Sequence, residues 1–207
     1  MPRPRSLTPD QLATAALAVI DRDGLAGLSM RAVAQEIGMS TMGLYRYVED
    51  RGELEQLVID RVLDTVDPMP PDRGRPWHER IEIMVERLRG VVGSHPWLVP
   101  LIIAHRHRSA TILRWSEPVA AILAEAGLDG RERVIALRSL LAYVVGAIQL
   151  EQLGPLAGAG TQVIADRAEL PYLSETARHA HDVTTDEEFH GGLALLLRGI
   201  GGGPAIR

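Results

Sequence analysis

The sequence predicts an all-α protein with a helix-turn-helix near its amino end. Apolar residues recur at helical spacing through most of the 207 residues, and no segment alternates with period two for long enough to form a strand. Gly-rich and Pro-rich stretches divide these helical patterns. One stretch, residues 25–54, holds two short helical patterns separated by a glycine, which is the arrangement of a helix-turn-helix.

The first helices carry clear start and stop signals. Thr8-Pro9-Asp10-Gln11 has the form of a capping box with proline at the first helical position, and the helix that it opens is expected to end at Gly24. Ser29 is a good N-cap for a second helix, and Gly38 is expected to stop that helix. Ser40 then begins a third.

The third helix is very short, from Thr41 to about Tyr47, with Leu44 and Val48 as its expected buried anchors. The second helix of such a pair can enter the major groove of DNA. We therefore expect this segment to read DNA.

Helical periodicity continues after this motif. Asp50 is a plausible N-cap for a fourth helix that runs to about Val66, and a Pro-rich stretch follows over residues 67–76, where a domain hinge is expected. The remaining helices are expected over residues 77–93, 97–104, 109–126, 130–152 and 186–198, with at most two short helical pieces near 162–168 and 173–179.

Charge and composition limit the possible functions. The formal net charge is −5 with a pI near 5.8, and residues 1–66 hold seven Arg against ten carboxylates, so DNA affinity must come mainly from short-range contacts. The absence of Cys excludes disulfides and thiolate metal sites. No signal peptide is visible, and the apolar run Val134–Leu150 is interrupted by Arg138 and Gln149, so we expect a buried helix, no membrane partner and a cytoplasmic protein.

The motif resembles the TetR family of transcriptional repressors. The matching residues include Ser29-Met30-Arg31, Ile37-Gly38 and Gly43-Leu44-Tyr45-Arg46-Tyr47, with the family spacing to Arg51 and Leu54. Two positions depart from the pattern, because Val48 stands where the family often has Phe and Arg51 where it often has Lys. More loosely, residues 88–101 and 188–193 resemble the C-terminal domain of the tetracycline-repressor subgroup.

The resemblance implies a domain division and three kinds of site. We expect a DNA-binding domain over residues 1–54, a connecting helix and hinge over 55–76, and a ligand-binding and dimerisation domain over 77–207. The expected DNA contacts are Arg31, Ser40, Thr41, Met42, Gly43, Tyr45, Arg46, Tyr47 and Arg51. The expected ligand pocket is lined by Met84, Leu88, Trp97, Ile102, Trp115, Tyr143 and Gln149. The expected dimer interface, from two helices that pair across a two-fold axis in the family, comprises Leu137, Leu141, Ile148, Phe189, Leu193 and Leu197.

Each of these features also has a plainer interpretation. Gly43 and Tyr47 can serve packing alone, and any one of the pocket residues is more often ordinary core. His105 and His107 do not suggest a metal site, because residues two apart on a helix diverge by about 200°. We expect no metal, no cofactor and no enzymatic activity, since no phosphate loop, nucleophile elbow or carboxylate pair is present.

The sequence thus predicts a homodimeric repressor that leaves a palindromic operator when a small apolar or amphipathic effector binds. A transcriptional activator of the same fold stays an alternative. A ligand-free architectural DNA-binding protein is disfavoured by the acidic total charge, and an enzyme with an incidental helix-turn-helix by the missing acid–base residues.

Overall fold

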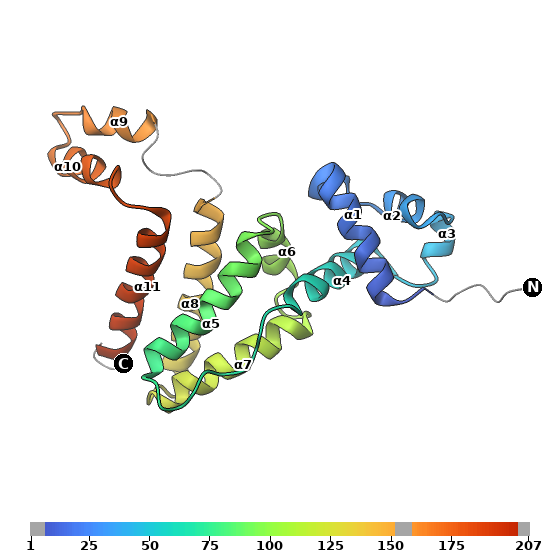
Figure 1. The fold of residues 1–207 in the computed structure, drawn as a ribbon, viewed down its shortest axis with the longest axis horizontal. Helices are drawn as coiled ribbons and strands as arrows, with labels where there is room; N and C mark the ends of the chain where they lie inside the picture. Colours follow the sequence, from blue (N-terminus) through green and yellow to red (C-terminus); the bar gives the residue numbers. More distant parts are fainter. Residues whose placement is uncertain (1–6, 152–158, 203–207) are drawn as a thin grey trace, which may run out of the picture. The chain divides into compact units, whose positions relative to one another are not determined.

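A computed structural model describes residues 7–151 and 159–202, and within these ranges every regular element is helical (Figure 1). The predicted all-α class is confirmed. The helices are α1 (Pro9–Gly27), α2 (Met30–Ile37), α3 (Thr41–Leu44), α4 (Arg51–Leu63), α5 (Trp77–Gly93), α6 (Leu98–His105), α7 (Ala110–Glu125), α8 (Gly130–Glu151), α9 (Ala159–Ala165), α10 (Pro171–Ala180) and α11 (Thr185–Gly202).

The contacts group the chain into two compact units. One comprises Met1–Pro70 with Glu86–Val119, and the other Pro71–Val85 with Ala120–Arg207. Helices α5 and α7 each contribute residues to both. The domain boundaries expected at residues 54 and 76 stay predictions. They separate segments by function, whereas the two compact units are defined by contacts alone.

The capping signals in the first unit act as the sequence predicts. Thr8 and Gln11 form the reciprocal capping box, with nitrogen–oxygen distances of 3.0 and 3.2 Å. The Ser29 hydroxyl accepts a hydrogen bond from the Ala32 amide at 3.1 Å, and Gly38 ends α2 in the left-handed conformation with φ 77°. These local interactions define where the helix-turn-helix begins and turns.

The end of α1 differs from the prediction. Gly24 adopts φ 73°, which interrupts the helical geometry where the sequence predicts the end, but helical residues resume as far as Gly27. The left-handed φ at Gly24 is the reason for a glycine at this position, because a side chain is strained there.

A single apolar core holds the helix-turn-helix together. Helix α1 packs against both α2 and α4, and α2 against α3 (Figure 1). The predicted anchors of α3, Leu44 and Val48, are buried. Trp97, which directly precedes α6, also packs against this core, although it lies some forty residues after the motif. We refer to helices α1–α4 as the head. Helix α6 contacts α4, so the first unit contains the head together with residues beyond the Pro-rich stretch.

In the second unit, α8 packs on α11 through Tyr143. Its hydroxyl donates to the Phe189 carbonyl at 2.7 Å, and the two rings lie 5.6 Å apart between centroids. Gly192, one turn after Phe189 on α11, leaves room for this hydroxyl, since a Cβ at residue 192 would overlap it and lie 2.9 Å from the Tyr143 Cζ atom. Helices α9 and α10 pack on each other.

A buried arginine joins α5 to the end of α7 in the same unit. Arg80 is only 4% exposed, and its Nη1 donates to the Glu125 carboxylate, which also pairs with Arg73 at 3.0 Å. The hydrogen bond from Arg80 lowers the pKa of the Glu125 carboxyl, against a smaller opposing effect of desolvation.

Helix α8 is buried along one stripe in the single chain. Only one stripe, Ala136, Leu140, Val144 and Ile148, is buried within the chain, while Val134 and Leu150 are exposed. By length and composition alone this helix is apolar enough to cross a membrane, although core helices share that property, and 22% of its apolar window is buried. Much of an apolar helix is therefore left without cover in the single chain.

Candidate nucleic-acid interface

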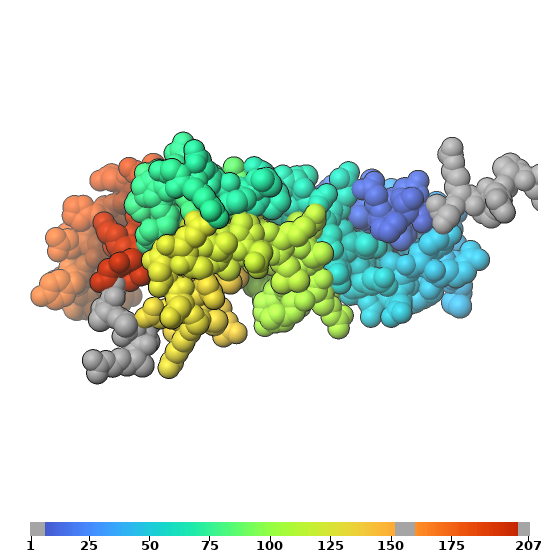
Figure 2. All heavy atoms as spheres, turned by 90° about the horizontal axis from the view of Figure 1, so that it is seen from below, coloured from blue at the N-terminus to red at the C-terminus, as the bar shows by residue number. Residues whose placement is uncertain are grey.

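The surface around α3 presents large side chains to solvent. Met42 is 77% exposed and Tyr45 48% exposed, and Arg46 is also exposed. The light-blue atoms of this part of the chain lie on the surface in Figure 2. Leu44 and Val48 anchor this segment in the helix-turn-helix core, so the backbone that carries the exposed side chains is held in place.

Other predicted contacts around α3 have structural roles. The Ser40 hydroxyl accepts the Gly43 amide at 3.1 Å, so it serves as the N-cap of α3. A Cβ at residue 43 would lie 3.3 Å from that same hydroxyl oxygen, which favours the packing interpretation of Gly43. Tyr47 is half-buried against the helix-turn-helix core, and Thr41 is half-buried at the start of α3. Among residues 41–47, Met42, Tyr45 and Arg46 are therefore the exposed members of the predicted set.

The three arginines of the surface differ in their surroundings. Arg31 and Arg46 are exposed and have no ion-pair partner among residues 7–151 and 159–202. Arg51, at the start of α4, donates from Nε to the Glu55 carboxylate at 2.8 Å, and its Nη2 lies 3.4 Å from the Leu25 carbonyl oxygen. The first two thus offer full charge to an anion, and the third shares its charge with Glu55.

Helix α4 forms four polar contacts with the segment that ends α6 and begins α7. Two involve the end of α6 and the turn after it: His105 Nε2 lies 2.9 Å from Glu55 Oε2, and the Gln56 amide donates to the Arg108 carbonyl at 3.1 Å. The other two are Ser109 Oγ to Asp60 Oδ1 at 2.6 Å and Arg114 Nη2 to Asp64 Oδ1 at 2.8 Å. We refer to these four as the α4 polar contacts. They supplement the apolar contact of Trp97 with the head.

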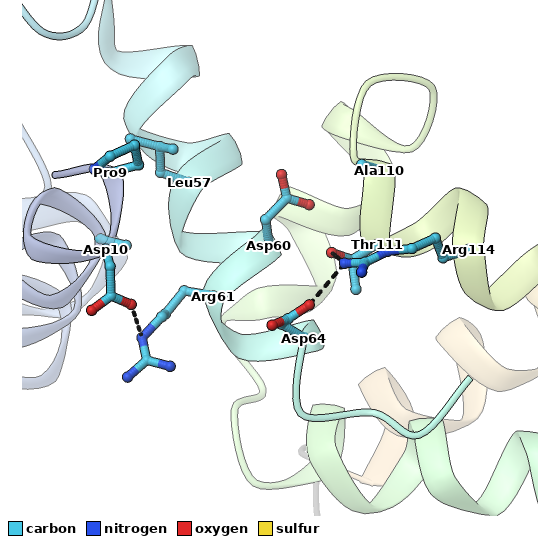
Figure 3. A pocket seen from close by; sticks show the side chains of 10 residues that line it. Pro9, Asp10, Leu57, Asp60, Arg61, Asp64, Ala110, Thr111 and Arg114 are labelled. Carbon is cyan, nitrogen blue, oxygen red and sulfur yellow. Dashed lines mark hydrogen bonds and ion pairs between the residues drawn. The ribbon is translucent and has the colours of Figure 1, made fainter. Parts of the chain in front are cut away.

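An open cleft of about 280 Å³ lies where α1, α4 and the start of α7 meet (Figure 3). Two ion pairs cross it, Asp10 with Arg61 at 2.9 Å and Asp64 with Arg114 at 2.8 Å. Its lining is Pro9, Asp10, Ala13, Leu57, Asp60, Arg61, Asp64, Ala110, Thr111 and Arg114. None of the predicted pocket residues belongs to this lining, and its charge does not suit an apolar effector.

The predicted ligand-pocket residues are divided between the two compact units. Leu88, Trp97, Ile102 and Trp115 belong to the first compact unit, whereas Met84, Tyr143 and Gln149 belong to the second. Trp97 packs against the helix-turn-helix core, and the Tyr143 hydroxyl is bonded to the backbone of α11. Gln149 is exposed, whereas Met84 and Trp115 are buried. The pocket stays a prediction.

The predicted dimer residues also separate into two groups. Ile148, Phe189, Leu193 and Leu197 are at most 3% exposed within the single chain, so their side chains pack the protomer's own core and do not suit a partner surface. The helical period correctly groups Phe189, Leu193 and Leu197 on one stripe, but the pattern alone cannot tell whether that stripe faces inward or a second copy. Leu137 and Leu141 are half-buried and stay predicted interface residues. The exposed apolar side chains of these helices are Val134, Leu150 and Leu195.

The side chains of the α4 polar contacts were not predicted from the sequence. Glu55 and Asp60 lie on α4, and Asp64 is its C-cap. Periodicity identifies only the apolar face of this helix, and each partner is about fifty residues distant along the chain. The one available signal is the presence of carboxylates on α4 together with a His- and Arg-rich segment at residues 105–108.

A short capped helix on a compact helical core, with exposed aromatic and basic side chains, defines the helix-turn-helix class of protein. Comparison with protein families gives the particular family. Residues 12–54 match the bacterial regulatory proteins of the tetR family, and residues 70–202 match the tetracyclin repressor-like C-terminal domain. The second match alone spans more than half of the chain, so the chain belongs to the TetR family.

Individual relatives agree with this membership. The HTH-type transcriptional repressor DrrR1 of Streptomyces coeruleorubidus is 37% identical over 70% of this chain and 54% of its own length. An HTH-type transcriptional regulator of Saccharopolyspora erythraea is 34% identical over 70% of this chain and 61% of its length, so the chain spans less than two thirds of both relatives.

Among solved structures, apo ActR from Streptomyces coelicolor superposes with a TM-score of 0.84 at 29% identity, covering 95% of this chain and 96% of that one. ActR has also been solved in complex with actinorhodin and with (S)-DNPA.

Proposed function

We propose that this protein is a cytoplasmic homodimeric transcriptional repressor, without enzymatic activity, that leaves a palindromic operator when a small molecule binds. The observation that carries the proposal is the exposed group Met42, Tyr45 and Arg46 on a capped helix-turn-helix, within a chain of the TetR family. Repression is favoured over activation because the relative DrrR1 is a transcriptional repressor.

The DNA contacts follow from the chemistry of these side chains. Arg46 can donate two hydrogen bonds to a guanine edge or a phosphate, and the Tyr45 hydroxyl can donate to a phosphate oxygen. Met42 offers an apolar contact to a thymine methyl group. Arg31 and Arg51 flank this group and are proposed to hold the DNA backbone.

The dimer is supported by the apolar surface that the single chain leaves open. On α8 and α11, Val134, Leu150 and Leu195 are exposed and Leu137 and Leu141 are half-buried. A partner subunit would cover such a surface on a water-soluble regulator. In the dimer two heads about 34–36 Å apart reach successive major grooves, so the operator is proposed to be palindromic.

The response to a ligand is proposed to pass through α6. Trp97 at its start packs on the head, and the α4 polar contacts hold its end, so a shift of this helix would move or loosen the head. A ligand that binds the shifted state more tightly lowers operator affinity by its differential affinity. A small-molecule effector is supported by the ActR complexes with actinorhodin and (S)-DNPA.

The proposal is tested with an operator fragment that the wild-type protein selects from random-sequence DNA. Arg46→Ala and Tyr45→Ala should each abolish retardation of this fragment in gels, while circular dichroism and sedimentation stay as in the wild type. Arg178→Ala on α10 removes an equal charge from an exposed site and should leave binding unchanged. Failure of the wild type to enrich any sequence would refute the function, and unchanged binding of both head variants would refute the contact residues.

The effector is sought by thermal shift, with actinorhodin and (S)-DNPA as the first probes. A compound that stabilises the protein should release the selected operator at similar concentrations. A compound that binds tightly without changing operator affinity would contradict its role as an effector, because equal affinity for both states shifts nothing.

A further inference from the structure

One carboxylate links the end of α6 to an arginine of the proposed DNA surface. Glu55 accepts from Arg51 Nε through Oε1 at 2.8 Å and bonds His105 Nε2 through Oε2 at 2.9 Å. Because a carboxylate only accepts, His105 Nε2 carries the hydrogen of the second bond. The two partners come from positions 51 and 105, on α4 and α6, and meet at the two oxygens of one side chain.

The burial of the three groups makes this sharing effective. The side chains of Glu55 and His105 are 15% and 11% exposed, whereas that of Arg51 is 48% exposed. The inner two are thus largely shielded from water, and the guanidinium alone reaches the surface, so its unused donors can meet a phosphate. Gly52 lies beside this imidazole, since a Cβ there would be in ordinary van der Waals contact with His105 Cε1 at 3.6 Å.

We propose that Glu55 is a positioning residue for Arg51, and that His105 sets how much of the arginine's charge a DNA phosphate meets. With His105 in place, the carboxylate divides its hydrogen bonding between two donors and holds Arg51 through Nε alone. If α6 withdraws His105, both carboxylate oxygens become available to the guanidinium, and Arg51 turns from the phosphate toward Glu55.

This link adds an electrostatic route to the geometric response of the dimer, and it rests on the proposed DNA-binding function. It also gives His105 a role that its sequence pattern did not reveal. The other charges near His105 are Asp50 on the capping turn of α4, next to Gly52, and Arg106, His107 and Arg108 on its own turn. Of this turn, His107 is exposed and provides a matched control.

The experiment is a mutant cycle read out by affinity for the selected operator. His105→Leu, which removes the donor, should weaken binding by up to roughly fivefold per half-site, the range of an exposed ion pair. The same substitution should have no effect in a protein that already carries Glu55→Gln or Arg51→Gln. His107→Leu should leave affinity unchanged in every background.

The salt dependence of binding separates electrostatics from packing. His105→Leu should also make the slope of log affinity against log salt shallower, by at most about one for each phosphate contact that is lost. A purely structural His105 would weaken binding equally in the Arg51→Gln background and leave the slope unchanged, and either result overturns the proposal. If the wild type binds no DNA, the proposed function has failed; if it binds and the cycle is additive, only this link has failed.

Discussion

Gly192 on α11 should tolerate no side chain while Tyr143 keeps its position. A Cβ at residue 192 would overlap the Tyr143 hydroxyl oxygen and lie 2.9 and 3.0 Å from the ring atoms Cζ and Cε2. The tyrosine can escape only by swinging away, which breaks its hydrogen bond to the Phe189 carbonyl and its contact with the Phe189 ring. Gly192→Ala should therefore destabilise the packing of α8 on α11.

The expected magnitude follows from the interactions that would be lost. A hydrogen bond contributes about 1 kcal/mol to the free energy of unfolding, and an aromatic pair about 0.5–1.5 kcal/mol. Replacing glycine by alanine inside a helix returns about 0.5–1 kcal/mol. Gly192→Ala should thus lower the free energy of unfolding by about 0.5–2 kcal/mol, although the substitution improves helix propensity.

Gly191 is the matched control, because a Cβ there would meet nothing within 4 Å. Gly191→Ala should raise the free energy of unfolding by about 0.5–1 kcal/mol. Urea unfolding followed by circular dichroism, at one protein concentration because dimerisation adds to stability, measures both variants. Tyr143→Phe should make Gly192→Ala less costly, since it removes the overlapping oxygen. Equal stability of the two alanine variants would refute the reasoning.

Three further predictions concern the two units and the dimer. Trp97→Ala should lower stability by about 2–3 kcal/mol in urea unfolding, because the half-buried indole leaves a cavity against the head core; an effect within 0.5 kcal/mol, roughly that of a surface substitution, would contradict this contact. The pKa of Glu125 is lower in the folded protein than its ordinary 4.5, so its contribution is present above pH 4.5 and is lost as the pH falls through the folded value. Glu125→Gln should therefore flatten the loss of stability below pH 4.5, and an unchanged acid limb would contradict the assignment. Leu195→Arg, at an exposed position, should give a folded monomer in sedimentation, whereas Leu193→Arg should unfold the protomer; a stable Leu195→Arg dimer would place the interface elsewhere.

Local signals predicted the head well because its boundaries depend on near neighbours. The Thr8 capping box, the Ser29 and Ser40 caps and the left-handed Gly38 each involve residues within four positions. Asp50 likewise caps α4 through the Glu53 amide at 2.9 Å. The sequence could therefore place the surface that carries the proposed DNA contacts.

Long-range pairing set the limit of the prediction. Trp97 has the composition of a pocket residue, and only the fold brings it to the head core. Leu193 and Phe189 form the predicted stripe, but periodicity states that a face is apolar and not which surface covers it. Glu55 appears on its helix as an ordinary solvated carboxylate, and its link to His105 depends on a turn fifty residues later.

The excess of carboxylates over arginines in the head should weaken its non-specific attraction to DNA. Arg31, Arg46 and Arg51 are the arginines proposed to contact DNA in each head, so these residues would contribute six charges in the proposed dimer. Six neutralised phosphates correspond to a slope of about −5 in log affinity against log salt, and sharing of Arg51 with Glu55 makes it shallower. Weak attraction to arbitrary DNA leaves the contacts of Met42, Tyr45 and Arg46 with bases and backbone to supply more of the total affinity. The small number of positive charges therefore favours discrimination between sequences, because the component of binding that is common to all DNA is small.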